Sequence, residues 1–214
     1  MDQPQSTARI ITGPEVMEEG AAFLRAVEPR FAPVLAGPLP MRLRPGGFAA
    51  LLWIITGQQV STASAAAIFA RLEAAGLTTA AAVAAAGEEA LRACGLSRPK
   101  IRYAMALADS GLDFAALRGL PTARVIETLV ALPGIGRWSA EIYAMFSLGH
   151  ADVMAGGDLA LQEAARLLFD LSARPSEREL RAMAEPWAPW RSVAAQALWV
   201  YYRAAKGREG IGAW

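Results

Sequence analysis

Leu-Pro-Gly-Ile-Gly-Arg-Trp at residues 132–138 decides the fold, and Gly-Gly-Asp at residues 156–158 follows it. Gly134 and Gly136 lack a Cβ, so the backbone can adopt positive φ there and leave successive N–H groups pointing outward at the start of the next helix. Such N–H groups bind anions, including the phosphates of DNA. The second stretch places the carboxylate of Asp158 at the start of another helix. A phosphate-binding hairpin followed by one poised acid indicates chemistry on DNA.

Composition sets the outer limits. The chain has 214 residues, 54% of them hydrophobic, which is enough to build the core of one domain over residues 1–214. Cys94 is the only cysteine, so the sequence predicts neither an internal disulfide nor a Cys/His metal cluster. The polar amino terminus does not resemble a signal peptide, and no apolar run approaches the length of a membrane span. We therefore expect a cytoplasmic protein, associated with the nucleoid through DNA.

The net charge of +1 argues weakly against nucleic acid, because phosphate-binding proteins usually carry a basic excess. The basic residues nevertheless recur in groups, which are Arg42 and Arg44, then Arg98, Lys100 and Arg102, and finally Arg191, Arg203, Lys206 and Arg208. They form either a basic face or a set of scattered solvated charges, and charge alone does not decide between these.

Glycine and proline interrupt a succession of short helical patterns, and no convincing alternating strand appears. The sequence therefore predicts an all-α fold in two lobes, with the active site in the cleft between them. Two expected helices start at Pro14 and Ser97, and a third follows a Ser176/Glu179 capping box. The other expected helices span residues 48–56, 61–75, 122–131, 138–147 and 191–205, and residues 79–94 form two short helices with a break at Gly87. Residues 30–46 are rich in proline and are expected to form a loop.

The hairpin covers residues 122–147. Leu129, Leu132 and Ile135 are its expected apolar anchors, while the glycine amides face outward to bind phosphate without reading a base. Taken alone, a Gly-x-Gly pair between helices is also compatible with an ordinary tight connection.

Four ordered motifs resemble the helix-hairpin-helix superfamily of DNA glycosylases, and in detail its 3-methyladenine DNA glycosylase II branch. They are the run Leu132–Ala140 with Gly156-Gly157-Asp158, the segment Ile54–Ser61, the segment Cys94–Lys100, and Trp187–Ser192 followed by Ala194 and Trp199. The resemblance covers roughly residues 40–205. Some relatives carry an amino-terminal β-domain, and we expect none here, because the stretch before Phe48 is too short to hold one.

The resemblance assigns the catalytic carboxylate to Asp158. As the base leaves, positive charge builds on the sugar, and a nearby carboxylate stabilises that charge and orients water. Asp158 would also serve as a helix N-cap, and both roles are compatible. The competing acid is Asp152, which we interpret as a turn or capping residue.

Superfamily members that also cut the strand carry a lysine at the position of Trp138, so the resemblance implies a monofunctional enzyme that uses water. It also places Trp138 and Trp199 in the base pocket, where an indole face attracts a cationic alkylated base. Phe48 is expected to line the same pocket. Trp187 and Trp190 are interpreted as core residues, and His150 as a turn residue after Gly149.

The resemblance implies that Gln59, or Gln58 beside it, fills the gap left by a flipped nucleotide. The expected DNA contacts are Gln58, Gln59, Ser61, Gly134, Ile135, Gly136 and Arg137. As in relatives, the backbone carbonyls of Val130, Leu132 and Ile135 can bind a structural Na⁺ or K⁺ ion that bridges to phosphate. No catalytic metal or organic cofactor is implied.

The predicted function is excision of alkylated bases from double-stranded DNA by a monomer: 3-methyladenine and 7-methylguanine, and also 1-methyladenine and 3-methylcytosine if the pocket is open. Two alternatives remain. One is a bifunctional glycosylase/lyase, against which Trp138 argues. The other is a non-catalytic helix-hairpin-helix module that binds damaged or abasic DNA. The sequence does not rank the lesions.

Overall fold

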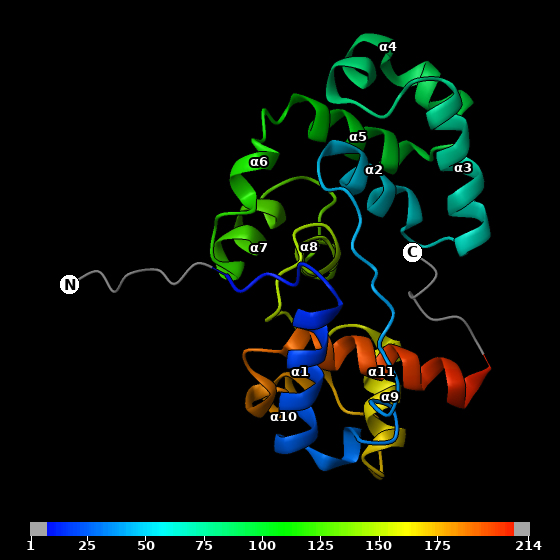
Figure 1. Ribbon diagram of the computed structural model, residues 1–214. Coiled ribbons are helices and arrows are strands. Elements are labelled where there is room, and N and C mark those ends of the chain that lie inside the picture. Colours follow the sequence, from blue (N-terminus) through cyan, green and yellow to red (C-terminus); the bar gives the residue numbers. More distant parts are fainter. Residues whose placement is uncertain (1–7, 208–214) are drawn as a thin grey trace. The chain divides into compact units, whose positions relative to one another are not determined.

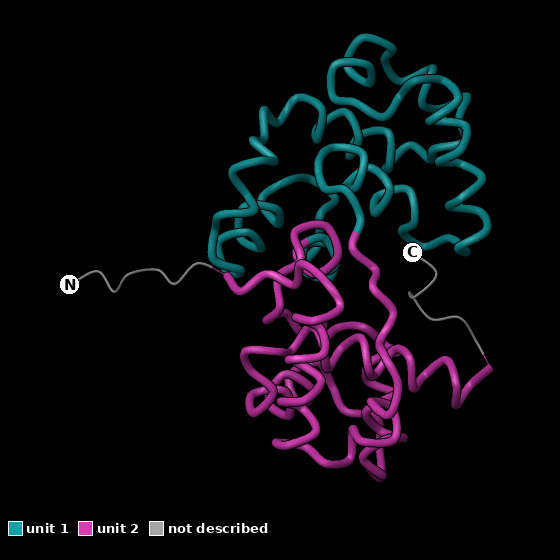
Figure 2. Tube along the Cα trace, in the orientation of Figure 1, with its two compact units in different colours: residues 1–6, 44–143 teal, residues 7–43, 144–214 magenta. Residues whose placement is uncertain are grey.

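The structure is a computed structural model that describes residues 8–207, which form two compact units (Figure 2). Residues 44–143 form unit 1, and residues 8–43 together with residues 144–207 form unit 2. Over the described residues the secondary structure is helical, with a single isolated β-bridge between Ile10 and His150 (Figure 1). The predicted all-α fold with two lobes is therefore confirmed.

Unit 1 contains seven helical segments. They are α2 (Phe48–Gly57), α3 (Thr62–Ala74), α4 (Ala80–Ala93), α5 (Arg98–Asp109), α6 (Phe114–Leu117), α7 (Thr122–Val130) and the first part of α8 (Arg137–Phe146), which crosses the unit boundary after Tyr143. Gly87 interrupts α4 with φ 71°, as the sequence predicts. The short α6, capped by Asp113, was not predicted.

The core of unit 1 forms where α2, α3, α4 and α5 pack on one another. Helix α2 is apolar on nearly every side, and Leu51, Leu52 and Ile55 are completely buried. From α4 and α5, Leu91 and Ile101 join this core. Full burial of one such side chain stabilises the fold by about 1.5–3 kcal/mol, so α2 is a rigid support for the turn that follows it.

Unit 2 contains α1 (Pro14–Val27), η1 (Pro29–Phe31), the end of α8, α9 (Leu159–Leu168), α10 (Glu177–Met183), η2 (Glu185–Trp187) and α11 (Arg191–Lys206). Helix α11 packs on α9 and α1. Phe31, Phe169 and Trp187 form an aromatic cluster with ring centroids 5.1–5.7 Å apart. Trp187 and Trp190 are buried, which confirms their predicted core role, and the Ser176/Glu179 capping box is present.

The structure refines one local expectation and corrects another. Gly134 has φ 81°, but Gly136 lies outside the left-handed region, so only one glycine of the hairpin needs positive φ. His150 lies in the isolated β-bridge to Ile10 rather than in a turn, and it is completely buried. The segment 30–46 is an extended connection apart from its first turns, where η1 ends at Phe31. Among residues 8–207, no helix combines the length and apolarity that a membrane crossing requires.

Candidate functional site

The hairpin of unit 1 joins α7 to α8 through residues 131–136. Leu129 and Ile135 are buried, as predicted for anchors, whereas Leu132 is half-buried. The N–H of Ile135 donates to the carbonyl of Leu132 at 3.1 Å and closes the turn. Gly136 is exposed, and a Cβ built there would meet no atom within 4 Å. Gly136 therefore belongs to the exposed surface of the hairpin, whereas Ile135 contributes packing.

A tyrosine ring packs directly against Gly134. A Cβ at Gly134 would lie 2.1 Å from the ring of Tyr103 in α5. Together with its φ of 81°, this contact allows only glycine at the position. Sequence reasoning missed Tyr103, which lies three residues after the third motif and carries no charge or other obvious chemistry.

The turn between α2 and α3 separates the roles of two glutamines. Gln58 is the C-cap of α2, and its amide Nε2 donates to the carbonyl of Gly134 at 2.9 Å and lies 3.4 Å from Ser139 Oγ. Gln59 is exposed and has φ 57°, in the left-handed region that side chains rarely adopt. Gln58 therefore ties the turn to the hairpin, while Gln59 stands at its exposed end. Ser61 is exposed as well and caps α3 by accepting the N–H of Ser64.

A buried lysine supports the same turn. Lys100 is 8% exposed, and its Nζ donates to the carbonyl of Thr56 at 2.8 Å, in the last turn of α2. Burial lowers the pKa of Lys100, because the charged form loses hydration. Lys100 and Tyr103 are one turn apart on α5, so one face of this helix supports both the glutamine turn and the hairpin.

In unit 2, Asp158 begins α9. It is 3% exposed, and its Oδ1 accepts the N–H groups of Ala160 at 2.8 Å and Leu161 at 3.0 Å. The same oxygen accepts the indole N–H of Trp199 at 3.4 Å. The predicted N-cap is confirmed, and the partial positive charge of the helix N-terminus favours the carboxylate. Trp199 is 1% exposed and lies against Phe146, with centroids 5.6 Å apart.

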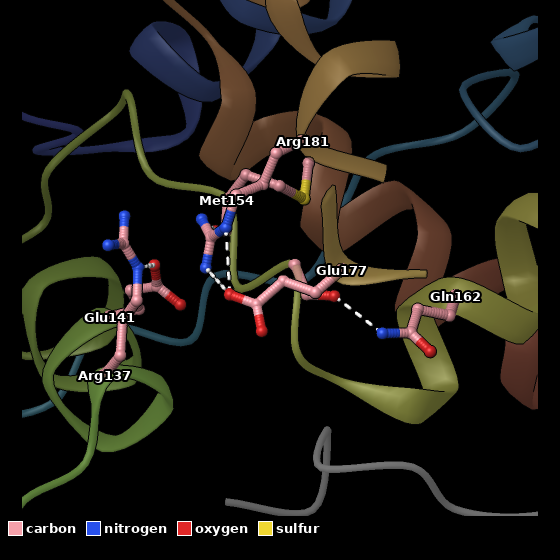
Figure 3. Close-up of polar contacts among 7 residues, drawn as sticks. Arg137, Glu141, Met154, Gln162, Glu177 and Arg181 are labelled. Atoms are coloured by element: carbon pink, nitrogen blue, oxygen red, sulfur yellow. Dashed lines mark hydrogen bonds and ion pairs between the residues drawn. The ribbon is translucent and has the colours of Figure 1, made fainter. Parts of the chain in front are cut away.

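The segment before Asp158 is fixed by side chains from α9 and α10 (Figure 3). Arg181 Nη1 donates to the carbonyl of Met154 at 2.7 Å, and Gln162 Nε2 donates to the carbonyl of Gly156 at 2.8 Å. Glu177 pairs with Arg181 through Nη2 at 2.7 Å. The sequence motifs indicated none of Gln162, Glu177 and Arg181.

Other predicted residues lie as follows. Asp152 sits in a bend and forms a bidentate ion pair with Arg191, at 2.5 and 2.6 Å, which raises the pKa of that arginine.

Trp138 lies in the unit 1 part of α8 and is half-buried, and Phe48 begins α2 and is 8% exposed. The exposed Arg137 pairs with the buried Glu141 at 3.0 Å (Figure 3). Among the described residues, no cluster of three His, Cys, Asp or Glu side chains is arranged to hold a metal ion.

Comparison with known proteins places these features in context. DNA-3-methyladenine glycosylase 1 of Schizosaccharomyces pombe is 36% identical over 116 residues, which are 52% of this chain and 51% of that protein. This chain thus spans about half the length of that relative.

Two solved structures are similar over most of this chain. One is a DNA-3-methyladenine glycosidase from Bacillus halodurans, 33% identical, with a TM-score of 0.77 over 93% of both chains. The other is the 3-methyladenine DNA glycosylase Mag1 of S. pombe in complex with abasic DNA, 26% identical, with a TM-score of 0.73 over 88% of this chain and 97% of that one. The model of the HhH-GPD superfamily of base excision DNA repair proteins matches residues 52–189. With the hairpin and Asp158 inside that match, the chain belongs to the HhH-GPD superfamily of base excision DNA repair proteins.

Proposed function

We propose that this protein is a monofunctional DNA glycosylase that removes alkylated bases from double-stranded DNA. The observation that carries the proposal is Asp158, a buried carboxylate whose Oδ1 is oriented by two backbone N–H groups at the start of α9 and by the indole N–H of Trp199 in α11. Its side chain is fixed before substrate arrives, as electrostatic catalysis requires. The names of the relatives support an alkylated base as the substrate.

The proposed reaction is hydrolysis of the N-glycosidic bond. That bond breaks, its electron pair leaves with the base, and positive charge develops at C1′ of the sugar. Asp158 stabilises this charge and orients a water molecule, whose oxygen bonds to C1′ while its proton passes to solvent. A base alkylated at a ring nitrogen is already cationic and leaves neutral, so no general acid is required.

Trp138 supports hydrolysis without strand cleavage. A lyase reaction needs an amine that attacks C1′ to form a Schiff base, and an indole has no such nucleophile. The half-buried ring is suited to contact a cationic base through its face, an attraction of about 0.5–2 kcal/mol. Phe48 lies in the same unit as Trp138, whereas Trp199 lies in unit 2, where its indole N–H donates to Asp158 Oδ1.

DNA binding is assigned to unit 1. The amides at Gly136 and Arg137 and the exposed Arg137 side chain meet backbone phosphates, and Ser61 adds a contact from the neighbouring turn. Gln59 fills the gap left by the flipped nucleotide, because it is exposed while Gln58 is committed to Gly134. Carbonyls at the end of α7 carry partial negative charge, which suits a Na⁺ or K⁺ ion held by Val130, Leu132 and Ile135. Such an ion would bridge the hairpin to phosphate.

The proposed partner is double-stranded DNA that contains 3-methyladenine, 7-methylguanine, 1-methyladenine or 3-methylcytosine, bound by a monomer in the cytoplasm at the nucleoid. The test is a purified-protein assay across these lesions, with released bases measured by chromatography. The wild-type protein should release free base, and Asp158→Asn should abolish release while abasic-DNA binding persists. Borohydride should trap no covalent complex. Full activity of Asp158→Asn contradicts the mechanism, and binding to abasic DNA without release of any base identifies a non-catalytic module instead.

A further inference from the structure

We propose that Arg181 and Gln162 are positioning residues that set the orientation of the Asp158 carboxylate. This inference rests on the proposed glycosylase function. None of the motifs that identify the family contains either residue. Their contacts converge on residues 154–157, the short segment that delivers the chain to Asp158 (Figure 3).

Gln162 brackets Asp158 from both sides. Its backbone N–H donates to the carbonyl of Asp158 at 3.0 Å, in the first turn of α9. Its side-chain Nε2 donates to the carbonyl of Gly156 at 2.8 Å, two residues before Asp158. Gln162 is 7% exposed, so water does not readily replace this bond. Gln162 therefore fixes the position of residues 154–157 relative to the first turn of α9.

Arg181 fixes the other end of the segment. Its Nη1 donates to the Met154 carbonyl at 2.7 Å, a charge-assisted bond. Glu177, one turn earlier on α10, holds the same guanidinium through Nε at 3.1 Å and Nη2 at 2.7 Å. The guanidinium fork is thereby held in one orientation, and the carbonyl of Met154 follows it.

The glycine at position 156 allows this close approach. A Cβ there would lie 2.9 Å from Cγ of Arg181 and 3.2 Å from the carbonyl oxygen of Glu177. The segment also folds back on itself, since the N–H of Asp158 donates to the carbonyl of Ala155 at 2.9 Å. Backbone and side-chain bonds together leave Asp158 little freedom.

The expected consequence falls on the chemical step. A misplacement of a catalytic group by about 1 Å can cost about 100-fold in rate. Arg181 and Gln162 lie in unit 2, whereas the hairpin and glutamine turn assigned to DNA binding lie in unit 1. Loss of either side chain should therefore lower kcat and leave KM and the affinity for abasic DNA unchanged.

The experiment compares Arg181→Met, Arg181→Lys and Gln162→Leu with the wild-type protein under saturating methylated DNA. Arg92→Met is the matched control, because Arg92 forms an i,i+4 pair with Glu88 in α4, as Arg181 does with Glu177 in α10. We expect kcat to fall about 10- to 100-fold in Arg181→Met and Gln162→Leu, with abasic-DNA affinity within about twofold of wild type. Arg181→Lys should recover part of the rate, since its ammonium can still donate to Met154. Arg92→Met should keep the wild-type kcat.

Each outcome decides the question. A wild-type protein that releases no base removes the proposed function and this inference with it. An active wild type with kcat unchanged in folded Arg181→Met or Gln162→Leu overturns the positioning role alone. Equal losses of kcat and of abasic-DNA affinity also overturn it, because they indicate general disruption. If Arg181→Met does not fold, Arg181→Lys and Gln162→Leu carry the same test.

Discussion

Replacement of Gly134 by alanine should lower the free energy of unfolding of unit 1 for two reasons. The first is backbone strain at φ 81°, which costs a residue with a Cβ about 1–2 kcal/mol. The second is overlap with the Tyr103 ring, 2.1 Å from the new Cβ, and such overpacking costs about 1–3 kcal/mol. The sum, about 2–5 kcal/mol, is a large fraction of the typical 5–15 kcal/mol stability of a folded protein.

The assay is urea unfolding followed by circular dichroism, with abasic-DNA binding measured in parallel. Gly136→Ala is the control, because Gly136 has neither positive φ nor a neighbour within 4 Å, and it should change stability by less than about 0.5 kcal/mol. In a Tyr103→Ala background the overlap is absent, so the cost of Gly134→Ala should fall to the strain of about 1–2 kcal/mol. Equal costs at positions 134 and 136, or an unchanged cost in the Tyr103→Ala background, would refute the reasoning.

Four further substitutions test the roles of single residues. Gln58→Ala should lower stability by about 1 kcal/mol through loss of its bond to the hairpin. Gln59→Ala should instead weaken abasic-DNA binding without a change in melting temperature, and the reverse assignment would contradict the proposed roles. Trp138→Leu should reduce kcat/KM for the cationic 7-methylguanine by about 2- to 30-fold and affect a neutral base less; an equal loss for both bases excludes a cation–π role. Hydrogen bonds from Arg166 and Lys206 lower the pKa of the Glu163 carboxyl group from 4.5 to about 2. Because the unfolded state binds the proton first, the stability that Glu163 contributes is present above pH 4.5 and lost as the pH falls toward 2. Glu163→Gln should therefore flatten the pH dependence of urea unfolding in that window, and an unchanged slope would show that the pairs do not persist in solution.

Local sequence signals predicted local structure well. The break at Gly87, the cap at Asp158 and the Ser176/Glu179 capping box all depend on residues within one or two turns of each other. Of the two hairpin glycines that permit positive φ, only Gly134 adopts it, because a glycine allows that conformation without requiring it. The burial of His150 depends on its pairing with Ile10, far away in the sequence.

The supports of the site were beyond the reach of sequence reasoning for the same physical reason. Lys100 could be read as one more surface cation, because nothing near it in the chain indicates that its ammonium ends on the Thr56 carbonyl. The contact of Tyr103 with Gly134 and that of Arg181 with Met154 likewise join distant segments. The motifs thus pointed to the groups assigned to substrate, and the tertiary structure was needed to find the groups that hold them.

The three donors on Oδ1 of Asp158 have a consequence for how this scaffold can diverge. An asparagine at the same position keeps an acceptor oxygen for the helix and the indole, and loses only the negative charge. On the proposed mechanism, a homologue with asparagine at position 158 would keep the fold and the binding of damaged DNA. It would lose the hydrolysis of the N-glycosidic bond. A repair enzyme and a catalytically inactive protein that binds damaged DNA would then differ by a single substitution at position 158.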